Sequence, residues 1–288
     1  MDSFVNNNII GIHVSLWTPE WSDDFVPFIS KAADLGFDAV EIPLMDPDAV
    51  PVGRIKKALA ASGLSVYCGT GLGPSTDISS TDAGVRKKGE EHLVRCLELA
   101  AEIGSPSLEG VLHSAWGRKG VVRDQERSYS ADVLRSIAVK AEKYGMKLGL
   151  ECLNRYESSF LNTVHQGKVF LRLIDRPNVG LHLDTYHMNI EERSIPQALK
   201  QAGEDLFFLH VSENNRGFPG RGSIPWHDIG RSVSDIGYTG PIVIESYITP
   251  DCSSGNDVSI WRPIEKDAEN TLKNSLLFVK GLFGLHAS

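Results

Sequence analysis

The sequence lacks the features that mark membrane, secreted and disulfide-rich proteins. No run approaches the roughly 20 apolar residues that a membrane-spanning helix needs. The first eight residues contain neither the basic nor the apolar segment of a signal peptide. Only four of the 288 residues are cysteine, and none forms a C-x-x-C pair. Free thiols are therefore expected rather than a disulfide framework. We expect a cytoplasmic protein with no membrane partner.

The sequence also has fewer basic residues than acidic ones. The 29 lysine and arginine residues are outnumbered by 37 aspartate and glutamate residues, which gives a net charge of −8. Phosphate backbones are bound by basic surfaces, so nucleic acid is not expected as a partner. No cradle of glycines and basic residues for a phosphate group is visible either, which favours a neutral small-molecule substrate.

Short apolar runs alternate with longer segments whose apolar residues have helical spacing. The expected strands are Ile9–Val14, Ala39–Ile42, Leu64–Cys68, Ser107–Leu112, Leu148–Glu151, Val179–Leu183, Leu206–His210 and Ile242–Glu245. The expected helices are Asp24–Leu35, Val52–Ala61, Ala83–Ile103, Ser128–Tyr144, His165–Ile174, Ile195–Ala202, Trp226–Ile236 and Lys266–Val279. Eight strand–helix units predict an α/β fold, a (β/α)8 TIM barrel that forms a single domain over residues 1–288. A doubly wound open sheet is the alternative, but no glycine-rich fingerprint follows the first strand.

Four consecutive apolar strands of this pattern end in a polar side chain: Glu151, Asp184, His210 and Glu245. The carboxyl ends of barrel strands converge on one face, so we expect these side chains to meet around one divalent metal. Taken singly, Asp184 could cap a loop and His210 could be a core histidine. Three carboxylates and one imidazole suit Mn²⁺, or else Co²⁺ or Mg²⁺, better than structural zinc.

Two of these carboxylates could also exchange protons with a substrate. A metal that holds a carbonyl and its neighbouring hydroxyl acidifies the carbon-bound proton between them. A carboxylate can then remove that proton as a general base. Glu151 and Glu245 lie three strands apart in a ring of eight, so they could face each other across the barrel mouth. Removal from one side and return from the other inverts the carbon, which favours epimerisation.

Several polar residues in the loops beyond these strands are further candidates. His187 could donate a hydrogen bond to a developing oxyanion, or face solvent. Arg216 could hold substrate oxygens with its forked donors, or be a surface arginine. Glu157 could hydrogen-bond a sugar hydroxyl, or pair with Arg155.

Aromatic residues and two unusual loops complete the candidates. Trp21 and Trp116 follow strands one and four and could form the walls of a sugar site, although loop tryptophans also serve packing alone. His13, near the end of strand one, could contact substrate or belong to the core. The glycine- and proline-rich loop Glu213–Pro225 and the long loop Ser246–Pro263 are candidate lids.

Several stretches together carry a family resemblance. They are Glu151-Cys-Leu-Asn-Arg-Tyr-Glu157 with Leu161-Asn-Thr163, Leu183-Asp-Thr-Tyr-His-Met-Asn-Ile-Glu-Glu192, His210-Val-Ser-Glu-Asn-Asn-Arg216, Pro225-Trp-His227, Glu20-Trp-Ser22, Leu35-Gly-Phe-Asp38 and His113-Ser-Ala-Trp116. With these stretches the chain resembles the ketose 3-epimerases, which include D-tagatose, D-psicose (allulose) and L-ribulose 3-epimerases, within the xylose-isomerase-like barrels. The resemblance runs over nearly the whole chain.

The resemblance implies a metal-dependent inversion at C3 of a free ketose. It implies that the four strand-end residues bind the metal and that Glu151 and Glu245 exchange protons on opposite faces of C3, through a cis-enediolate and without a redox cofactor. It also implies that His187 and Arg216 contact the O1/O2 end of the sugar. Family members are usually dimers or tetramers, so a homodimer or homotetramer is expected.

Further contacts follow from the same resemblance. It places Glu157 beside His187 and Arg216, and it makes Trp116 and Trp21 pocket walls. His13 stands where many psicose epimerases carry tyrosine, and there the chain is more similar to L-ribulose 3-epimerases. Asn154 and Arg155 are expected to be scaffolding.

Three other functions were weighed against epimerisation. An aldose–ketose isomerase of the same superfamily, similar to hydroxypyruvate or L-rhamnose isomerase, would move the proton between C1 and C2. A metal-dependent nuclease on this fold would need several metals and a surface for DNA, which the negative charge disfavours. A noncatalytic sugar-binding protein would not need proton carriers at Glu151 and Glu245.

Overall fold

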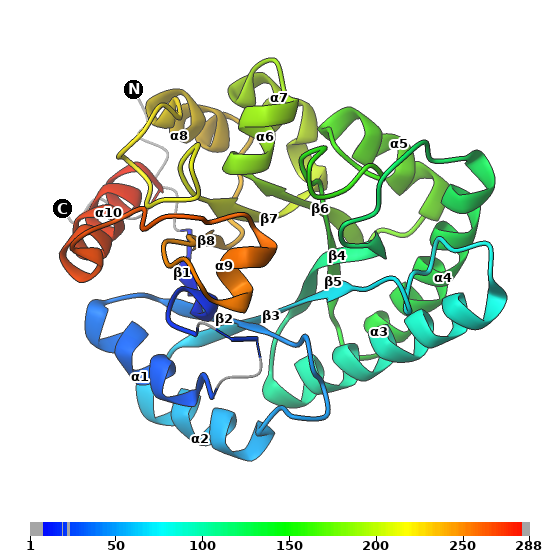
Figure 1. Cartoon of the computed structure of the whole chain (residues 1–288), viewed down its shortest axis with the longest axis horizontal. Coiled ribbons are helices and arrows are strands. Elements are labelled where there is room, and N and C mark those ends of the chain that lie inside the picture. Colours follow the sequence, from blue (N-terminus) through cyan, green and yellow to red (C-terminus); the bar gives the residue numbers. More distant parts are fainter. Residues whose placement is uncertain (1–7, 19, 22–23, 284–288) are drawn as a thin grey trace.

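The computed structural model describes residues 8–18, 20–21 and 24–283, and parallel strands close into a barrel at its centre (Figure 1). The strands are β1 (Ile10–His13), β2 (Ala39–Pro43), β3 (Ser65–Leu72), β4 (Ser107–Ala115), β5 (Lys147–Glu151), β6 (Val179–Asp184), β7 (Leu206–Val211) and β8 (Ile242–Ile244). Each strand pairs with the next in the sequence, and β1 pairs in parallel with β8 to close the ring. The predicted (β/α)8 barrel is confirmed.

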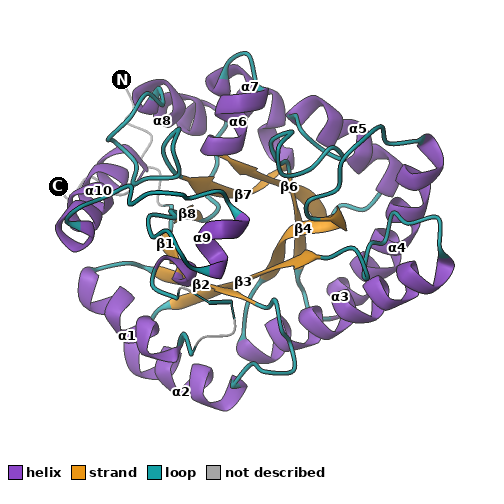
Figure 2. Ribbon diagram, in the orientation of Figure 1, coloured by secondary structure: helices purple, strands orange, loops and turns teal. Residues whose placement is uncertain are grey.

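Most helices surround the barrel, and those that lie between strands in the chain connect them (Figure 2). The helices are α1 (Val26–Leu35), α2 (Val52–Ser62), α3 (Ala83–Ile103), α4 (Asp124–Lys143), α5 (Val164–Ile174), α6 (Thr185–Glu191), α7 (Ile195–Ala202), α8 (Trp226–Asp235), α9 (Ser253–Asp257) and α10 (Ala268–Phe283). Within the described ranges, no helix combines the length and the apolar content needed to cross a membrane.

Local signals in the sequence set several helix ends. The side chain of Asp82 accepts hydrogen bonds from the backbone N–H groups of Gly84 and Val85, which caps the start of α3. Gly36 follows α1 with φ of 90°, a left-handed conformation that glycine adopts without a steric penalty. Gly36 therefore forms the C-cap of α1.

The structure departs from the predicted elements mainly near the barrel mouth. Strand β3 continues to Leu72 and β4 to Ala115, beyond their predicted ends at Cys68 and Leu112. Helix α4 begins at Asp124 rather than near Ser128, because the Glu126 carboxylate accepts the backbone N–H of Arg123 and holds an extra first turn. The short helices α6 and α9 were not predicted, since helices of 7 and 5 residues leave little periodicity to detect.

Buried apolar side chains form three clusters, two of which belong to the barrel and its surrounding helices. The larger core lies mainly between the barrel and the outer helices. A small cluster of Ala39, Tyr67, Phe208 and Val243 lies inside the barrel. Successive strand residues point to opposite faces, so positions two residues further along the same strands also point inward. Those positions carry Glu41 after Ala39, His210 after Phe208 and Glu245 after Val243. The barrel interior therefore becomes more polar toward the carboxyl ends of the strands.

Candidate active site

A pocket opens at the carboxyl ends of the strands. It encloses about 550 Å³ of empty space, including its open mouth. Strands from every part of the ring contribute lining residues, as expected for a barrel active site. All eight residues singled out there by the sequence for substrate contact or proton transfer line it: His13, Trp21, Trp116, Glu151, Glu157, His187, Arg216 and Glu245.

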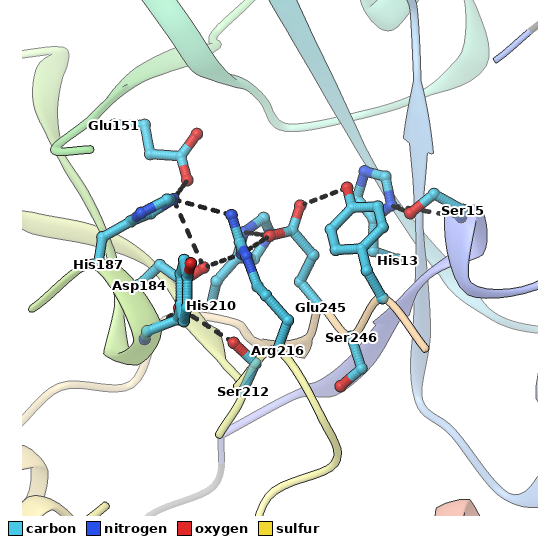
Figure 3. A network of polar contacts seen from close by, with 12 residues as sticks. His13, Ser15, Glu151, Asp184, His187, His210, Ser212, Arg216, Glu245 and Ser246 are labelled. Atoms are coloured by element: carbon cyan, nitrogen blue, oxygen red, sulfur yellow. Dashed lines mark hydrogen bonds and ion pairs between the residues drawn. The ribbon is translucent and has the colours of Figure 1, made fainter. Parts of the chain in front are cut away.

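The four strand-end residues lie together: Glu151, His210 and Glu245 line the pocket, and Asp184 is fully buried beside them. Glu151 and Asp184 are the last residues of β5 and β6, His210 lies near the end of β7, and Glu245 directly follows β8. All four are buried, and each offers a ligand atom within 4.8 Å of those of the others. Figure 3 shows their side chains turned toward a common centre. A cluster of three carboxylates and one imidazole at this spacing can hold a divalent metal ion.

His210 is prepared for this role by Glu41. The Oε2 atom of Glu41 lies 2.6 Å from Nε2 of His210, and both residues are buried. The bond places the ring proton on Nε2 and leaves Nδ1 for the cluster. Within the described residues, Nδ1 has no hydrogen-bond partner, although it lies 3.5 Å from Glu245. Burial alone would lower the pKa of His210, but Glu41 and Glu245 raise it well above its usual range.

Arg216 supplies positive charge to the same cluster. Its Nη1 atom donates hydrogen bonds of 2.8 Å to Asp184 and to Glu245. The side chain is 3% exposed, and its guanidinium lies 4.2 Å from the ring centre of Tyr186. Burial would lower the pKa of Arg216, but Glu157, Asp184 and Glu245 raise it well above its usual range. The buried contacts do not fit the alternative of a surface arginine.

The two candidate proton carriers have different surroundings. Burial, together with the charge of Glu245, raises the pKa of Glu151 well above its usual range. Burial would also raise the pKa of Glu245, but His210 and Arg216 hold it well below its usual range. Tyr247 donates a further hydrogen bond of 3.2 Å to Oε1 of Glu245. One carboxyl thus favours the protonated form and the other the ionised form, although a divalent cation between them would favour ionisation of both.

His187 lies within the cluster rather than in solvent. It is 1% exposed on α6, and its Nδ1 accepts the backbone N–H of Asn154 at 3.2 Å. In the neutral ring this places the proton on Nε2, which lies 3.6 Å from Glu151 and 3.1 Å from Nη2 of Arg216, a group that can only donate. Burial and the charge of Arg216 lower the pKa of His187 to about 3. The ring is therefore neutral near pH 7.

Glu157 is held beside His187 and Arg216. Its Oε1 accepts a hydrogen bond of 2.9 Å from the Asn154 side chain and lies 3.5 Å from Nη2 of Arg216. Trp116 donates to its Oε2 at 3.3 Å. The alternative pairing with Arg155 does not occur, because Arg155 binds Glu191 at 2.8 Å. Asn154 acts as scaffolding by fixing both Glu157 and the His187 ring.

Aromatic side chains form one wall of the pocket. Trp21 makes edge-on contacts with Trp116 and with Tyr247, each with 6.3 Å between ring centres. Its indole N–H donates to Asp257, in the short helix α9 of the loop that follows β8. Val258 and Ile260 pack against the same rings. The 246–263 loop thereby closes one side of the pocket.

The loop 213–225 is braced from within. The buried carboxylate of Glu213 accepts hydrogen bonds from the backbone N–H of Gly220 at 2.9 Å, from that of Arg221 at 3.0 Å and from the Trp226 indole at 2.6 Å. These bonds fix the loop that presents Arg216, whose own backbone has a left-handed φ of 65°. The loop is therefore a shaped part of the site.

Sequence reasoning missed three residues at the site. Glu41 and His182 lie inside strands, two residues beyond or before positions already known to face inward, so strand alternation was the signal that could have found them. Tyr247 follows Glu245 by two residues and lines the pocket. His13, left open between substrate contact and core, lines the pocket and lies 2.5 Å from Ser15 through its Nδ1.

Comparison with known proteins agrees with this geometry. A family model described as xylose isomerase-like TIM barrel matches residues 29–274. A ketose 3-epimerase of Arthrobacter globiformis is 36% identical over 282 residues, 94% of this chain and 95% of its own length. An L-ribulose 3-epimerase of Methylomonas sp. (strain DH-1) is 34% identical over 274 residues, 94% of this chain and 96% of its own. The crystal structure of D-psicose 3-epimerase in the presence of D-fructose is similar with a TM-score of 0.92 and 33% identity, over 96% of this chain and 99% of that one.

Proposed function

The chain belongs to the xylose isomerase-like TIM barrels and, within them, to the ketose 3-epimerases, and from this premise we propose that it inverts C3 of an unphosphorylated ketose. The observation that carries the proposal is the pair of buried carboxylates, Glu151 and Glu245. They reach one cluster from β5 and β8, which β6 and β7 separate in the ring. Two carboxylates on different sides of one pocket suit removal and return of a proton better than they suit binding alone.

We propose that Glu151, Asp184, His210 and Glu245 hold the metal. The fit rests on their donor set and on Nδ1 of His210, which no other described group satisfies. Three oxygen donors with one nitrogen favour Mn²⁺, or else Co²⁺ or Mg²⁺. When bound, the cation polarises a ketose carbonyl and its neighbouring hydroxyl, and so acidifies the proton on C3, the carbon next to the carbonyl.

The side chains of this protein then move the proton. One of the two carboxylates, Glu151 or Glu245, accepts the proton from C3, and the other returns a proton to the opposite face. One proton leaves C3 and one comes back, so the ketose is neither oxidised nor reduced. His187 donates its Nε2–H to the oxygen on which negative charge develops. Arg216 and Glu157 position the hydroxyl groups at the same end of the sugar.

The charges that line the pocket favour a free sugar over a phosphorylated one. Among the described residues that line the pocket, Arg216 is the only lysine or arginine. Its Nη1 atom is already engaged by Asp184 and Glu245. A phosphate group would therefore meet carboxylates without a spare cation. The ring faces of Trp21 and Trp116 offer a neutral sugar an apolar wall instead.

We further propose that the protein works in the cytoplasm as a homodimer or homotetramer. The four cysteines are all buried free thiols, which agrees with the sequence prediction and supports a reducing compartment. Light scattering of the purified protein measures the oligomeric state, and a monomer at micromolar concentration would contradict this part of the proposal.

Isotope exchange tests the reaction. The purified enzyme is incubated with Mn²⁺ in D₂O, separately with D-fructose, D-tagatose and L-ribulose, and the sugars are separated by chromatography. We expect a C3-inverted ketose that carries deuterium at C3. An aldose product with deuterium at C1 or C2 would show an isomerase instead. Excess EDTA should abolish turnover and Mn²⁺ should restore it, and undiminished activity in EDTA would exclude the metal-dependent mechanism.

A further inference from the structure

His182 is a buried histidine that the proposed reaction does not use. It lies on β6 two residues before Asp184, so both side chains point into the barrel. The residue is 1% exposed. Within the described part of the chain, neither of its ring nitrogens has a hydrogen-bond partner. A buried imidazole without partners loses the hydrogen bonds that water would give it, which costs free energy. A ligand that binds one of its nitrogens would offset that cost.

The ring is held next to the metal cluster. Its centre lies 4.2 Å from that of His210, and the two rings are nearly perpendicular. Phe208 packs against its other side, with 5.1 Å between ring centres. The ring also lines the pocket, so a small ion can reach it from the barrel mouth.

These contacts create a second set of ligands. Glu151, His182 and His210 each offer a ligand atom within 4.8 Å of the other two, and all three are buried. Glu151 and His210 also belong to the cluster with Asp184 and Glu245. The two sets differ in chemistry: the first has two imidazoles and one carboxylate, and the second has one imidazole and three carboxylates.

We propose that Glu151, His182 and His210 form an inner metal site, which binds Zn²⁺ or Cu²⁺ in competition with the outer site that includes Asp184 and Glu245. Imidazole nitrogen suits Zn²⁺ and Cu²⁺, whereas a carboxylate-rich set suits Mn²⁺ and Mg²⁺. Nε2 of His210 is held by Glu41, so Nδ1 is the ring atom left for a metal. One Nδ1 serves one cation, and occupation of the inner site therefore excludes the outer one.

The competition has a consequence for the choice of metal. A cation at the inner site lies deeper in the barrel and lacks Asp184 and Glu245 as ligands. Zinc or copper would thus be bound tightly and yet hold the site in an unproductive form. The inference rests on the proposed metal cluster, but it does not depend on which sugar reacts or on whether any sugar reacts.

Copper spectroscopy tests the inner site directly. Protein stripped of metal receives one equivalent of Cu²⁺, and electron paramagnetic resonance measures how many nitrogen nuclei couple to the copper. We expect two nitrogens in the wild type, from His182 and His210, and one in His182→Leu. Asp184→Asn alters only the outer site, so it should keep the two-nitrogen signal. One nitrogen in the wild type, or two in His182→Leu, would overturn the proposal.

Titration calorimetry supplies a second measurement. Loss of a hydrogen-bond partner of a metal ligand costs roughly 10–100-fold in affinity, so loss of a ligand should weaken Zn²⁺ binding at least tenfold in His182→Leu. Mn²⁺ binding should be unchanged in that variant and weakened in Asp184→Asn. Equal losses of Zn²⁺ and Mn²⁺ in His182→Leu would contradict two distinct sites.

Two controls separate these outcomes from misfolding and from surface binding. His165→Gln removes an exposed imidazole on α5 and should leave the copper spectrum unchanged. A spectrum that changes in His165→Gln but not in His182→Leu would show adventitious copper only, which counts against the inner site. If His182→Leu does not fold, His182→Gln removes the imidazole while it keeps a polar side chain of similar size, and the same two-to-one change is expected.

Discussion

Replacing Glu41 with glutamine should weaken Mn²⁺ binding about tenfold while the barrel stays folded. Oε2 of Glu41 lies 2.6 Å from Nε2 of His210, and both side chains are almost fully buried. The carboxylate fixes the ring orientation and leaves Nδ1 for the proposed metal. Glutamine has nearly the same shape, and its amide oxygen can accept the same hydrogen bond, but it carries no charge.

The magnitude follows from the change in hydrogen-bond type. A hydrogen bond to a charged group contributes about 1.5–3 kcal/mol, and one between neutral groups about 0.5–1.5 kcal/mol. The difference is about 1–1.5 kcal/mol, and about 1.4 kcal/mol corresponds to tenfold in a binding constant. The tenfold loss lies at the lower end of the roughly 10–100-fold usually lost with such a partner. Glu41→Leu should lose more, because it leaves a buried N–H without an acceptor.

Titration calorimetry with Mn²⁺ on metal-free protein measures the loss, and Glu109→Gln is the matched control. Glu109 is also fully buried, on β4, and it accepts a hydrogen bond from Ser107 rather than from His210. Burial and the neighbouring Glu41 raise the pKa of Glu109 well above its usual range, which favours its neutral form, so glutamine changes little. Unchanged Mn²⁺ affinity in Glu41→Gln, or the same loss in both variants, would refute the reasoning.

Three further results are expected. Glu151→Gln and Glu245→Gln should each abolish epimerisation with an unchanged circular dichroism spectrum, and near-normal turnover in either would contradict the two-carboxylate mechanism. Tyr247→Phe removes the hydrogen bond to Glu245, so kcat should fall about tenfold, or about 1.4 kcal/mol, at nearly constant KM, and equal kcat values would show that the hydroxyl does not orient the carboxylate. Burial lowers the pKa of His113 from 6.5 to about 4, so the unfolded chain binds more protons in that range and stability falls as the pH decreases from 6.5 toward 4. Urea unfolding at pH 7 and at pH 5 measures how much the free energy of unfolding falls between the two pH values. This fall should be about 2 kcal/mol smaller in His113→Gln than in the wild type, and an equal fall in both proteins would exclude His113 as its source.

The barrel and the residues at its strand ends could be predicted because both follow from local sequence patterns. Apolar runs with turn residues between them identify strands, and parallel strands in a ring bring their carboxyl ends together. Glu151, Asp184 and His210 each end such a run, so their meeting followed from topology alone. The short helices α6 and α9 could not be predicted, because their 7 and 5 residues are fixed by contacts with the site rather than by periodicity.

The partners within the site were harder to predict than its members. Arg216 reaches Asp184 only because the 213–225 loop folds back around Glu213, and nothing in the local sequence specifies that path. Glu41 comes 169 residues before His210, the side chain it holds. Contacts across such distances depend on strand register, which a single sequence does not state.

The bridge from Arg216 to Asp184 and Glu245 bears on how the protein is assembled in the cell. Carboxylates packed together repel one another, and some small metal-binding domains fold only when their metal is bound. Here the guanidinium is a counter-ion that the chain carries itself, joined to both acids at 2.8 Å. The barrel can therefore be completed on or soon after synthesis, before any cation arrives. Under the proposed function, metal supply then decides how many finished molecules are active, and a molecule that loses its ion can bind another without refolding.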